Sequence, residues 1–512
     1  MLVKVFGAAV QGIKATEITI EVNCNKGIKF MLVGLPDASV KESHERIVSA
    51  LQVNGYNFPR QQIVINMSPA DIRKEGSAYD LPLAIGIMGA SGELSNEKFD
   101  DYILMGELSL DGNILPIKGA LPIAIMAKEL GYRGFILPIE NAKEAAVVEG
   151  LDVYGVENIK DVVGFFNNDI ELEKTIVDLN QEFINSQSAF EFDFSDVKGQ
   201  ESVKRALEVA AAGGHNIIMI GPPGAGKSMM AKRMPSILPP FTMNEALETT
   251  KIHSVAGKLE GTSSLMSRRP FRSPHHTISD VAMVGGGAYP QPGEISLAHN
   301  GVLFLDELPE FNRSVLEVMR QPLEDRKITI SRAKFSVEYP ASFMLVSAMN
   351  PCPCGFYNHP EKQCVCPAGA VQKYLNKISG PLLDRIDIHI EIVPVPFDKI
   401  SDRTPAEHSD EIRKRVVHAR KIQEERFKNI DGIYCNAQMT SKLLHKYAEP
   451  DEAGLKLLKT AMERLNLSAR AYDRILKVSR TIADLNDSEK VLPSHLAEAI
   501  NYRNLDRETW AG

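Results

Sequence analysis

Asn216-Ile-Ile-Met-Ile-Gly-Pro-Pro-Gly-Ala-Gly-Lys-Ser228 sets the architecture of this chain. An apolar run of strand character leads directly into G-x-x-x-x-G-K-[ST], and the helix-compatible run Met-Met-Ala-Lys-Arg-Met follows. A strand before and a helix after are the context that a phosphate-binding loop requires. A Gly/Pro turn between a strand and a helix is the ordinary alternative, but it does not explain a match at every fixed position.

The residue types of this loop suit a nucleotide phosphate chain. Glycines let the backbone curl, so that consecutive N–H groups and the next helix N-terminus converge on an anion. Lys227 would reach the β- and γ-phosphates, and the Ser228 hydroxyl would reach Mg²⁺. The expected ligands are ATP and Mg²⁺, and the expected binding residues are Gly221, Pro222, Pro223, Gly224, Ala225, Gly226, Lys227 and Ser228.

A second apolar strand pattern, Gly301-Val-Leu-Phe-Leu-Asp306-Glu307, ends in two carboxylates. In phosphate-loop enzymes a carboxylate at this place holds Mg²⁺, which is the role we expect for Asp306. Glu307 is then expected to orient the attacking water. An apolar strand also ends in Asp-Glu by chance, but such a strand following a phosphate loop favours the catalytic interpretation.

The composition is that of an ordinary globular protein. The chain has 512 residues, of which 44% are hydrophobic and 24% charged, enough for about three domains. The formal net charge of −8 confines any nucleic-acid contact to a local groove or pore. No apolar run approaches the roughly 18 residues of a membrane span, and the N-terminus lacks a signal-peptide pattern. We therefore expect a cytoplasmic protein.

Residues 1–166 alternate β-rich runs with helical patterns, which predicts an α/β domain. Within it, residues 64–80, 106–117 and 135–138 resemble the proteolytic domain of Lon. Peptidases of that type activate a Ser nucleophile with a Lys base. In the resemblance, Ala78 and Leu121 stand where the nucleophile and the base belong. We expect a Lon-like fold without the peptidase dyad; a displaced dyad of Ser77 with Lys74 or Lys118 is the alternative.

The remaining boundaries follow from composition and from a second resemblance. Residues 167–190 are acidic, polar and irregular, which predicts a linker. The lead-in Phe194-Ser-Asp-Val-Lys-Gly-Gln200 resembles that of AAA+ ATPases. The run from Gly293 through Glu307 resembles the magnesium-chelatase-like branch of AAA+ proteins. We expect an AAA+ core with a parallel sheet over residues 191–395 and a helical lid over residues 396–512.

The AAA+ resemblance implies further catalytic residues. Asn350, at the end of a strand pattern, matches the first sensor, which contacts the γ-phosphate or the attacking water; an Asn-Pro turn is the alternative. Arg385 matches the arginine that one subunit offers to the ATP of its neighbour. A salt-bridged helix end is the alternative. Ser468 is predicted to begin a helix as its N-cap. Arg470 in that helix matches the second sensor, with Arg474 in reserve.

Two cationic segments are candidates for contact with DNA. The first contains Arg268, Arg269 and Arg272, together with His275 and His276. It is interpreted as a loop that meets a polyanion or a neighbouring subunit, as a solvated face, or, through its histidines, as a metal site. The second is a predicted hairpin over residues 328–338 with Arg332 and Lys334 near its tip. A hairpin that is simply exposed to solvent is its alternative.

Four of the six cysteines form the pattern C-x-C-x₉-C-x-C, at Cys352, Cys354, Cys364 and Cys366. Four thiolates on one short polar loop predict a structural Zn²⁺ site, because metal binding orders a segment that has no core of its own. Two disulfides or four free thiols are the alternatives.

Together these features give the chain the domain order of the YifB/ComM family. The resemblance implies a homo-oligomeric, hexameric ring ATPase that binds single-stranded or branched DNA. It would act as a branch-migration helicase in recombination of incoming DNA. A chelatase-type or protein-remodelling ATPase is the alternative, and a Lon-like ATP-dependent protease is the second alternative.

Overall fold

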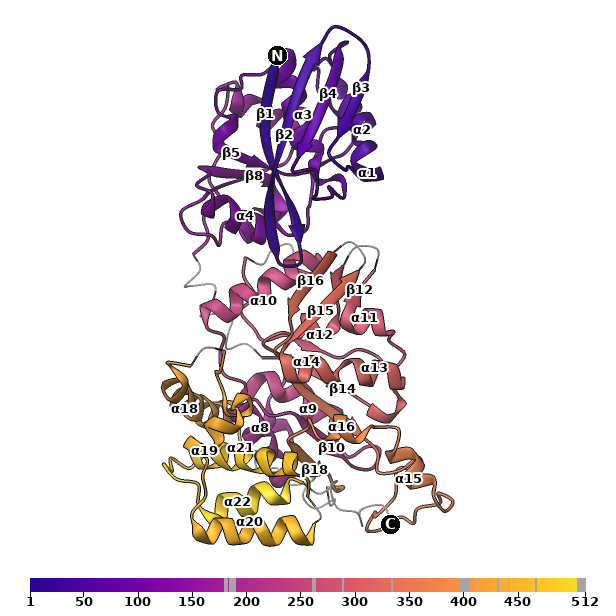
Figure 1. Ribbon diagram of the computed structural model, residues 1–512, viewed down its shortest axis with the longest axis vertical. Helices are drawn as coiled ribbons and strands as arrows, with labels where there is room; N and C mark the ends of the chain where they lie inside the picture. Colours follow the sequence, from indigo (N-terminus) through magenta and orange to yellow (C-terminus); the bar gives the residue numbers. More distant parts are fainter. Residues whose placement is uncertain are drawn as a thin grey trace. The chain divides into compact units, whose positions relative to one another are not determined.

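The computed structural model describes residues 1–178, 183, 190–259, 264–287, 290–332, 335–395, 406–430, 432–465 and 467–503. Its contacts divide the chain into two compact units (Figure 1). Unit 1 contains residues 1–186 and 243–267, and unit 2 contains residues 187–242 and 268–512. Among the described residues, no helix has the length and apolar character needed to cross a membrane.

Unit 1 is built on a seven-stranded mixed sheet in the order β3-β4-β2-β1-β5-β8-β9. β1 and β2 form a long antiparallel hairpin, whereas β5, β8 and β9 run parallel to one another. Such a sheet must be covered by helices, and α3 is buried along nearly its whole length against β1 and β2. The strands are β1 (Leu2–Gln11), β2 (Lys14–Asn25), β3 (Phe30–Val33), β4 (Gln62–Ser68), β5 (Tyr102–Leu104), β8 (Gly134–Pro138) and β9 (Asp152–Val156). The helices are α1 (Ala38–Lys41), α2 (Ser43–Val53), α3 (Asp80–Ser91), α4 (Ala120–Glu129), α5 (Ile139–Ala145) and α6 (Ile159–Phe166).

One helix that the sequence assigned to the AAA+ core belongs to unit 1. Helix α10 (Met243–Ala256) packs on α4, and the Gly119 N–H donates to the Ser254 carbonyl over 3.1 Å. The chain therefore passes from unit 2 into unit 1 after α9, at residue 243, and re-enters unit 2 at Arg268. The predicted boundaries followed the order of motifs along the chain, which carries no signal for this packing.

Unit 2 contains a five-stranded sheet in the order β11-β14-β17-β10-β18, and every neighbouring pair is parallel. The predicted α/β core with a parallel sheet is thereby confirmed. Buried Ile, Val, Leu and Met side chains fill its central strands, as expected for a sheet covered on both faces. The strands are β10 (Ile217–Ile220), β11 (Phe271–Arg272), β14 (Val302–Leu305), β17 (Met344–Met349) and β18 (Ile388–Glu391). The helices of this part are α8 (Glu201–Gly213), α9 (Lys227–Ile237), α11 (Asp280–Val284), α12 (Glu294–Leu297), α15 (Ala370–Leu375) and α16 (Gly380–Leu383).

The helical segment after Glu307 is broken into two pieces. It forms two short helices, α13 (Arg313–Val318) and α14 (Arg320–Asp325). Pro322 explains the break, because a proline lacks the N–H that would bond the carbonyl four residues earlier and its ring clashes there. The hairpin that follows consists of β15 (Lys327–Arg332) and β16 (Phe335–Pro340), close to the predicted range.

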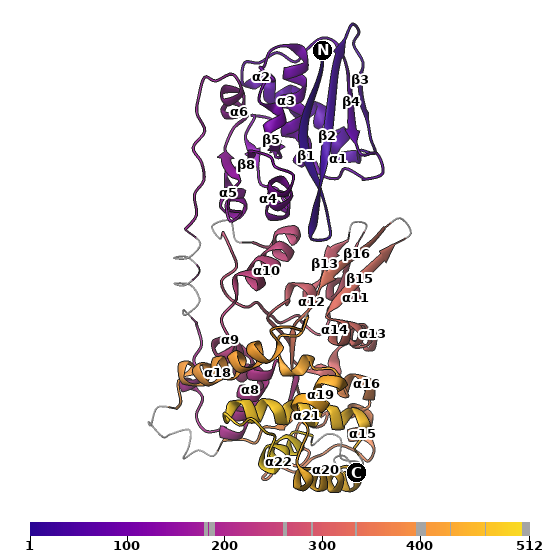
Figure 2. The same cartoon turned by 60° about the vertical axis from the view of Figure 1, so that its left-hand side comes forward.

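The C-terminal helices of unit 2 pack against helices that flank its five-stranded sheet. Helices α18 and α21 contact α8, and α18 also contacts α9 (Figure 2). Ser468 caps α21 as predicted, because its side chain accepts a hydrogen bond from the Ala471 N–H over 3.2 Å. The helices are α18 (Ser409–Phe427), α19 (Ser441–Tyr447), α20 (Glu452–Arg464), α21 (Ala469–Leu485) and α22 (Pro493–Asn501).

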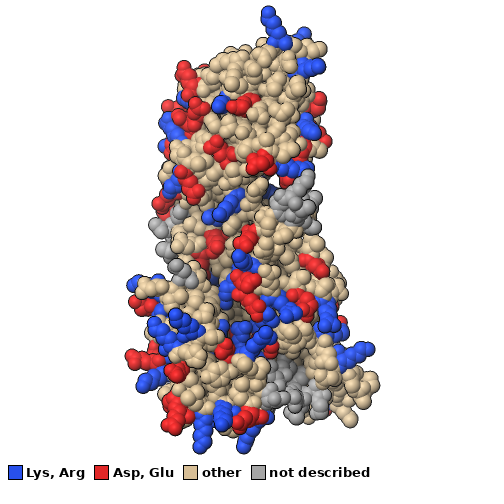
Figure 3. Space-filling view, in the orientation of Figure 1, with Lys and Arg blue, Asp and Glu red and all other residues tan. Residues whose placement is uncertain are grey.

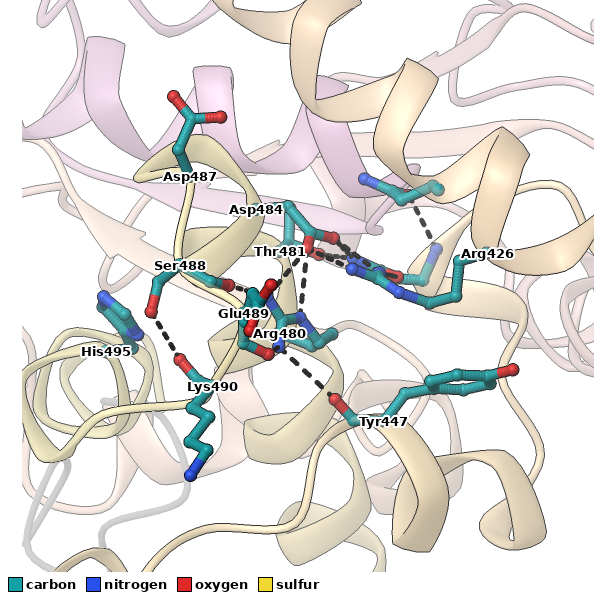
Figure 4. A network of polar contacts seen from close by, with 12 residues as sticks. Arg426, Tyr447, Arg480, Thr481, Asp484, Asp487, Ser488, Glu489, Lys490 and His495 are labelled. Atoms are coloured by element: carbon teal, nitrogen blue, oxygen red, sulfur yellow. Dashed lines mark hydrogen bonds and ion pairs between the residues drawn. The ribbon is translucent and has the colours of Figure 1, made fainter.

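A buried polar network orders these helices (Figure 4). The Asp484 carboxylate accepts hydrogen bonds from Arg426 over 2.7 Å, from Arg480 over 3.1 Å and from the Asn436 amide over 2.7 Å. The Asn436 amide also donates to the Thr481 hydroxyl over 3.1 Å. A buried carboxylate that accepts from three donors holds α18, α21 and the loop before α19 in one arrangement.

We expect Asp484→Asn to lower the free energy of unfolding of unit 2 by about 3–5 kcal/mol, because two buried guanidinium groups lose their counter-charge. Urea unfolding monitored by circular dichroism would measure the change. Asp487→Asn is the matched control, since Asp487 pairs with His418 and is 68% exposed. Equal stability of the two variants would contradict the assigned role of Asp484.

Candidate nucleotide site and four-cysteine loop

Strand direction places the predicted nucleotide residues at one edge of the sheet of unit 2. β10, β14 and β17 are parallel neighbours, so their carboxyl ends meet at the same edge. The phosphate-loop residues follow β10, Asp306 and Glu307 follow β14, and Asn350 follows β17. This carboxyl edge is where ligands bind in open parallel sheets.

The loop itself has the backbone conformation that the motif requires. Gly224 and Gly226 have φ angles of 79° and 89°, in the left-handed region that favours glycine. Gly221 meets a different constraint, because a Cβ there would lie 2.5 Å from the Ile392 carbonyl oxygen. Helix α9 begins at Lys227, so its N-terminus opens onto the loop.

Lys227 is held at the centre of this edge. Its ammonium group donates to the carbonyls of Gly221 and Pro222 over 2.7 and 2.9 Å, and to Asn350 Oδ1 over 3.1 Å. Burial lowers the pKa of Lys227, while the carboxylates of Asp306 and Glu307 act in the opposite direction. The structure thus brings together the phosphate-loop lysine and the predicted first sensor.

Ser228 and Asp306 form the second contact between the motifs. The Ser228 hydroxyl donates to the Asp306 carboxylate over 2.5 Å. A hydroxyl and a carboxylate are hard oxygen ligands of the kind that Mg²⁺ prefers alongside water and phosphate oxygens. The two side chains therefore fit the metal expected with a nucleotide.

Glu307 has a partner that sequence reasoning missed. Its φ is 52°, its side chain is 57% exposed, and its carboxylate lies 3.5 Å from His276 Nδ1. The sequence placed His276 in a cationic segment and offered it as a possible metal ligand, but it did not predict a contact with Glu307. Within the described residues, the one group of three or more metal-binding side chains is the cysteine cluster, so a histidine metal site is not found there. One feature of the sequence could have indicated this contact: His276 lies between the phosphate loop and the Asp306-Glu307 strand end.

The predicted arginines Arg385 and Arg470 lie at the other edge of this sheet. Arg385 precedes β18, and β18 is parallel to β10, so Arg385 is at the amino edge. Its guanidinium group bonds Glu324 and the Pro381 carbonyl. Arg470 is 66% exposed and lies 3.2 Å from Asp384, while Arg474 pairs with Asp387 over 3.1 Å. Strand direction therefore separates these three arginines from the phosphate loop of their own chain.

Arg269 and Arg272, proposed from the 268–276 segment, have partners inside unit 2. Arg269 donates to the carbonyls of Pro239 and Asn300, each over 2.7 Å, and stacks over Phe241. Arg272 makes a bidentate pair with Glu294 over 2.6 and 2.7 Å. Arg268 is exposed. Of the hairpin candidates, Lys334 and the Arg332 side chain lie outside the described residues.

The four cysteines of residues 352–366 converge. Their sulfur atoms all lie within 4.8 Å of one another, and none forms a disulfide. Although burial opposes it, backbone N–H groups of Phe356 and Val365 lower the pKa of Cys354 to about 6. A thiolate at neutral pH and three adjacent sulfurs are the donor set of a closed tetrahedral Zn²⁺ site.

The cysteine loop also contacts the phosphate loop. Gly355 has a φ of 83°, and a Cβ at this position would lie 2.5 Å from Pro223 Cδ. Cys352, which begins the cluster, is fully buried and lies two residues after Asn350. The conformation of the cysteine loop therefore affects the nucleotide-binding residues through direct packing.

In unit 1 the residues considered for peptidase chemistry have other partners. The Ser77 hydroxyl bonds the Glu107 carboxylate, and the buried Lys74 ammonium bonds the Pro69 carbonyl. Leu121 is buried in α4, and its N–H donates to Glu144 over 2.9 Å. These contacts do not form a serine–lysine dyad.

Three family models match successive parts of the chain. Residues 193–400 match the family described as magnesium chelatase, subunit ChlI; residues 20–141 and 406–503 match its ChlI and ChlI C-terminal companions. The competence protein ComM of Haemophilus influenzae is 42% identical over 98% of this chain and 97% of its own length. The protein YifB of Escherichia coli is 42% identical over 98% and 96%. Lon protease 2 of Bacillus subtilis is 32% identical over 28% of this chain and 27% of its own length.

Proposed function

The chain belongs to the magnesium-chelatase-like YifB/ComM family of AAA+ ATPases, and from that premise we propose that it is a ring-forming DNA motor driven by Mg-ATP hydrolysis. Its proposed task is helicase-driven branch migration during recombination of incoming DNA. One relative carries the name competence protein, which fits a task in DNA uptake.

The contact of Lys227 with Asn350, beside that of Ser228 with Asp306, carries the ATPase proposal. Lys227 would bind the β- and γ-phosphates, and Ser228 and Asp306 would hold the metal. Bound Mg²⁺ neutralises charge on the phosphate oxygens as the terminal phosphoryl group leaves. Glu307 would orient the attacking water, and Asn350 would bind the γ-phosphate or that water.

The amino-edge position of Arg385 and Arg470 supports hydrolysis at a subunit interface. An arginine supplied by a neighbour stabilises the charge of the transition state, which makes turnover depend on assembly. In the separate chain Arg385 is bonded to Glu324, so assembly would exchange that carboxylate for a phosphate. This arrangement requires a closed homo-oligomer, which we propose to be a hexamer.

For DNA we propose that the hairpin of β15 and β16 supplies the contact, through Arg332 and Lys334, which the sequence predicts near its tip. On the face drawn in Figure 3, basic and acidic side chains are interspersed over both units. Together with the net charge of −8, this favours a local grip on the phosphodiester backbone over a broad basic surface.

The four-cysteine loop is proposed to hold one structural Zn²⁺. The convergent sulfurs support this proposal, and four thiolates leave no open coordination position for catalysis. The packing of Gly355 on Pro223 gives the ion a role in ordering the nucleotide edge.

Glu307→Gln is expected to bind ATP with wild-type affinity and to lower kcat by about 10²–10⁴-fold, because the amide cannot accept a proton from water. Steady-state phosphate release and binding of a fluorescent nucleotide measure the two effects. Glu310→Gln is the control, since Glu310 pairs with Lys377 at the surface over 3.2 Å. Wild-type turnover in the Glu307 variant would remove the assigned role.

Metal analysis of the purified chain is expected to find about one zinc per chain, because four thiolates complete one tetrahedral site. Cys364→Ser should lose the metal, and Cys24→Ser, which changes a cysteine of unit 1, should retain it. Plasma mass spectrometry after exhaustive dialysis makes the measurement. A folded wild-type protein free of zinc would end this part of the proposal.

Single-stranded DNA and a four-way junction are expected to stimulate the ATPase activity of the wild type, and Arg332→Ala/Lys334→Ala should lose the stimulation. Lys327→Ala changes a cation of the same hairpin that pairs with Glu338 over 2.9 Å, and should keep it. ATPase activity that is indifferent to every DNA tested would instead favour a chelatase-type or protein-remodelling motor.

A further inference from the structure

The proposed function assigns no ligand to a cavity at the amino edge of the sheet of unit 2. Its volume is about 190 Å³, and residues preceding β10 and β18 form one side of it. Arg326, which follows α14, and Arg474 and Lys477, on α21, are among its lining side chains. The space is sufficient for a tetrahedral oxyanion together with ordered water.

The charges that line this cavity do not balance. In the separate chain its two carboxylates already have partners: Asp387 accepts from His215 and pairs with Arg474, each over 3.1 Å, and Glu324 is bonded to Arg385. Within the described part of the chain, Arg326 and Lys477 bond only neutral oxygens. Arg326 donates to the Ser342 hydroxyl over 3.2 Å, and Lys477 donates to the Ala437 carbonyl over 2.9 Å.

The electrostatics of the two cations agree with this imbalance. Burial and the nearby Arg474 lower the pKa of Lys477 to about 8, and Arg326 acts in the same direction, while Asp387 and Asp473 oppose the shift. Burial also lowers the pKa of Arg326; Cys435 and Asp387 oppose this shift, and Arg474 and Arg420 add to it. Two partly desolvated cations with spare N–H donors face one cavity, and such groups are costly without an anion.

We infer that this cavity binds a phosphate group, held by Arg326 and Lys477. Two uncompensated positive charges match the two negative charges of a phosphate better than the single charge of a carboxylate. The planar fork of Arg326 binds two oxygens of one phosphate, and Lys477 supplies a point charge for a third. The phosphate is either free in solution or the terminal phosphate of a nucleotide on a second copy of the chain.

The first arm uses calorimetry to measure how inorganic phosphate binds to Lys227→Ala protein at low protein concentration. This variant lowers the affinity of the phosphate loop for phosphate. We expect saturable binding that Lys477→Met reduces tenfold or more, the loss expected for a charge-assisted hydrogen bond. Arg326→Met is the second variant. Lys459→Met, at a site 77% exposed, is the control and should bind like its parent. Removing a buried cation is not expected to unfold the protein, and the melting temperature without phosphate checks this.

The second arm measures ATP turnover by assembled protein that retains Lys227. If dilute protein does not bind phosphate but Lys477→Met lowers kcat at unchanged nucleotide affinity, the phosphate belongs to the neighbouring nucleotide. Phosphate binding lost in Lys477→Met identifies free phosphate as the ligand. If neither effect is seen, the assignment is overturned. The first arm does not depend on hydrolysis, so a failure of the ATPase proposal leaves it readable.

Discussion

The parallel direction of all strands in the five-stranded sheet of unit 2 is the constraint on which its chemistry depends. Because each strand runs the same way, every turn that follows a strand is at one edge and every turn that precedes a strand is at the other. The carboxyl edge gathers Lys227, Asp306 and Asn350. The amino edge gathers Arg385, Asp387 and the cationic cavity. One sheet therefore separates the groups that would bind a nucleotide in the same chain from those available to a second copy.

The helical region is attached to the amino edge by buried polar contacts. His215, which precedes β10, bonds Asp387 through Nδ1 over 3.1 Å and Thr481 through Nε2 over 2.8 Å. Thr481 belongs to the network of Asp484 (Figure 4). The polar contacts therefore run from the sheet into the helices without a break. Apolar packing tolerates small shifts, whereas buried hydrogen bonds fix partners and angles. The position of α21, which carries Arg470 and Arg474, is consequently fixed by the sheet edge opposite the phosphate loop.

The sequence could predict the features that depend on local chemistry. The phosphate loop, the strand ends at Asp306 and Asn350, and the Ser468 cap each rest on residues that are neighbours along the chain. Contacts made over long separations carried no such signal. Arg269 and Arg272 lie in a segment whose composition suggests a polyanion site. In the structure, however, Arg269 donates hydrogen bonds to carbonyls and Arg272 donates to Glu294. The packing of α10 on α4 and the approach of His276 to Glu307 likewise depend on surfaces that only the fold creates.

Many arginines of unit 2 are bonded within the unit, and this affects how a chain with a net negative charge would bind DNA. Arg269, Arg272, Arg426 and Arg480 are bonded to carbonyls or carboxylates within the unit, so they add little to an external field. Affinity for a polyanion grows with the number of phosphates that cations neutralise, and it falls with salt accordingly. Few contacts per subunit give weak binding, which a ring can compensate by engaging several subunits on one strand. Such a grip can be released at one subunit while the others hold, as stepwise movement driven by ATP requires.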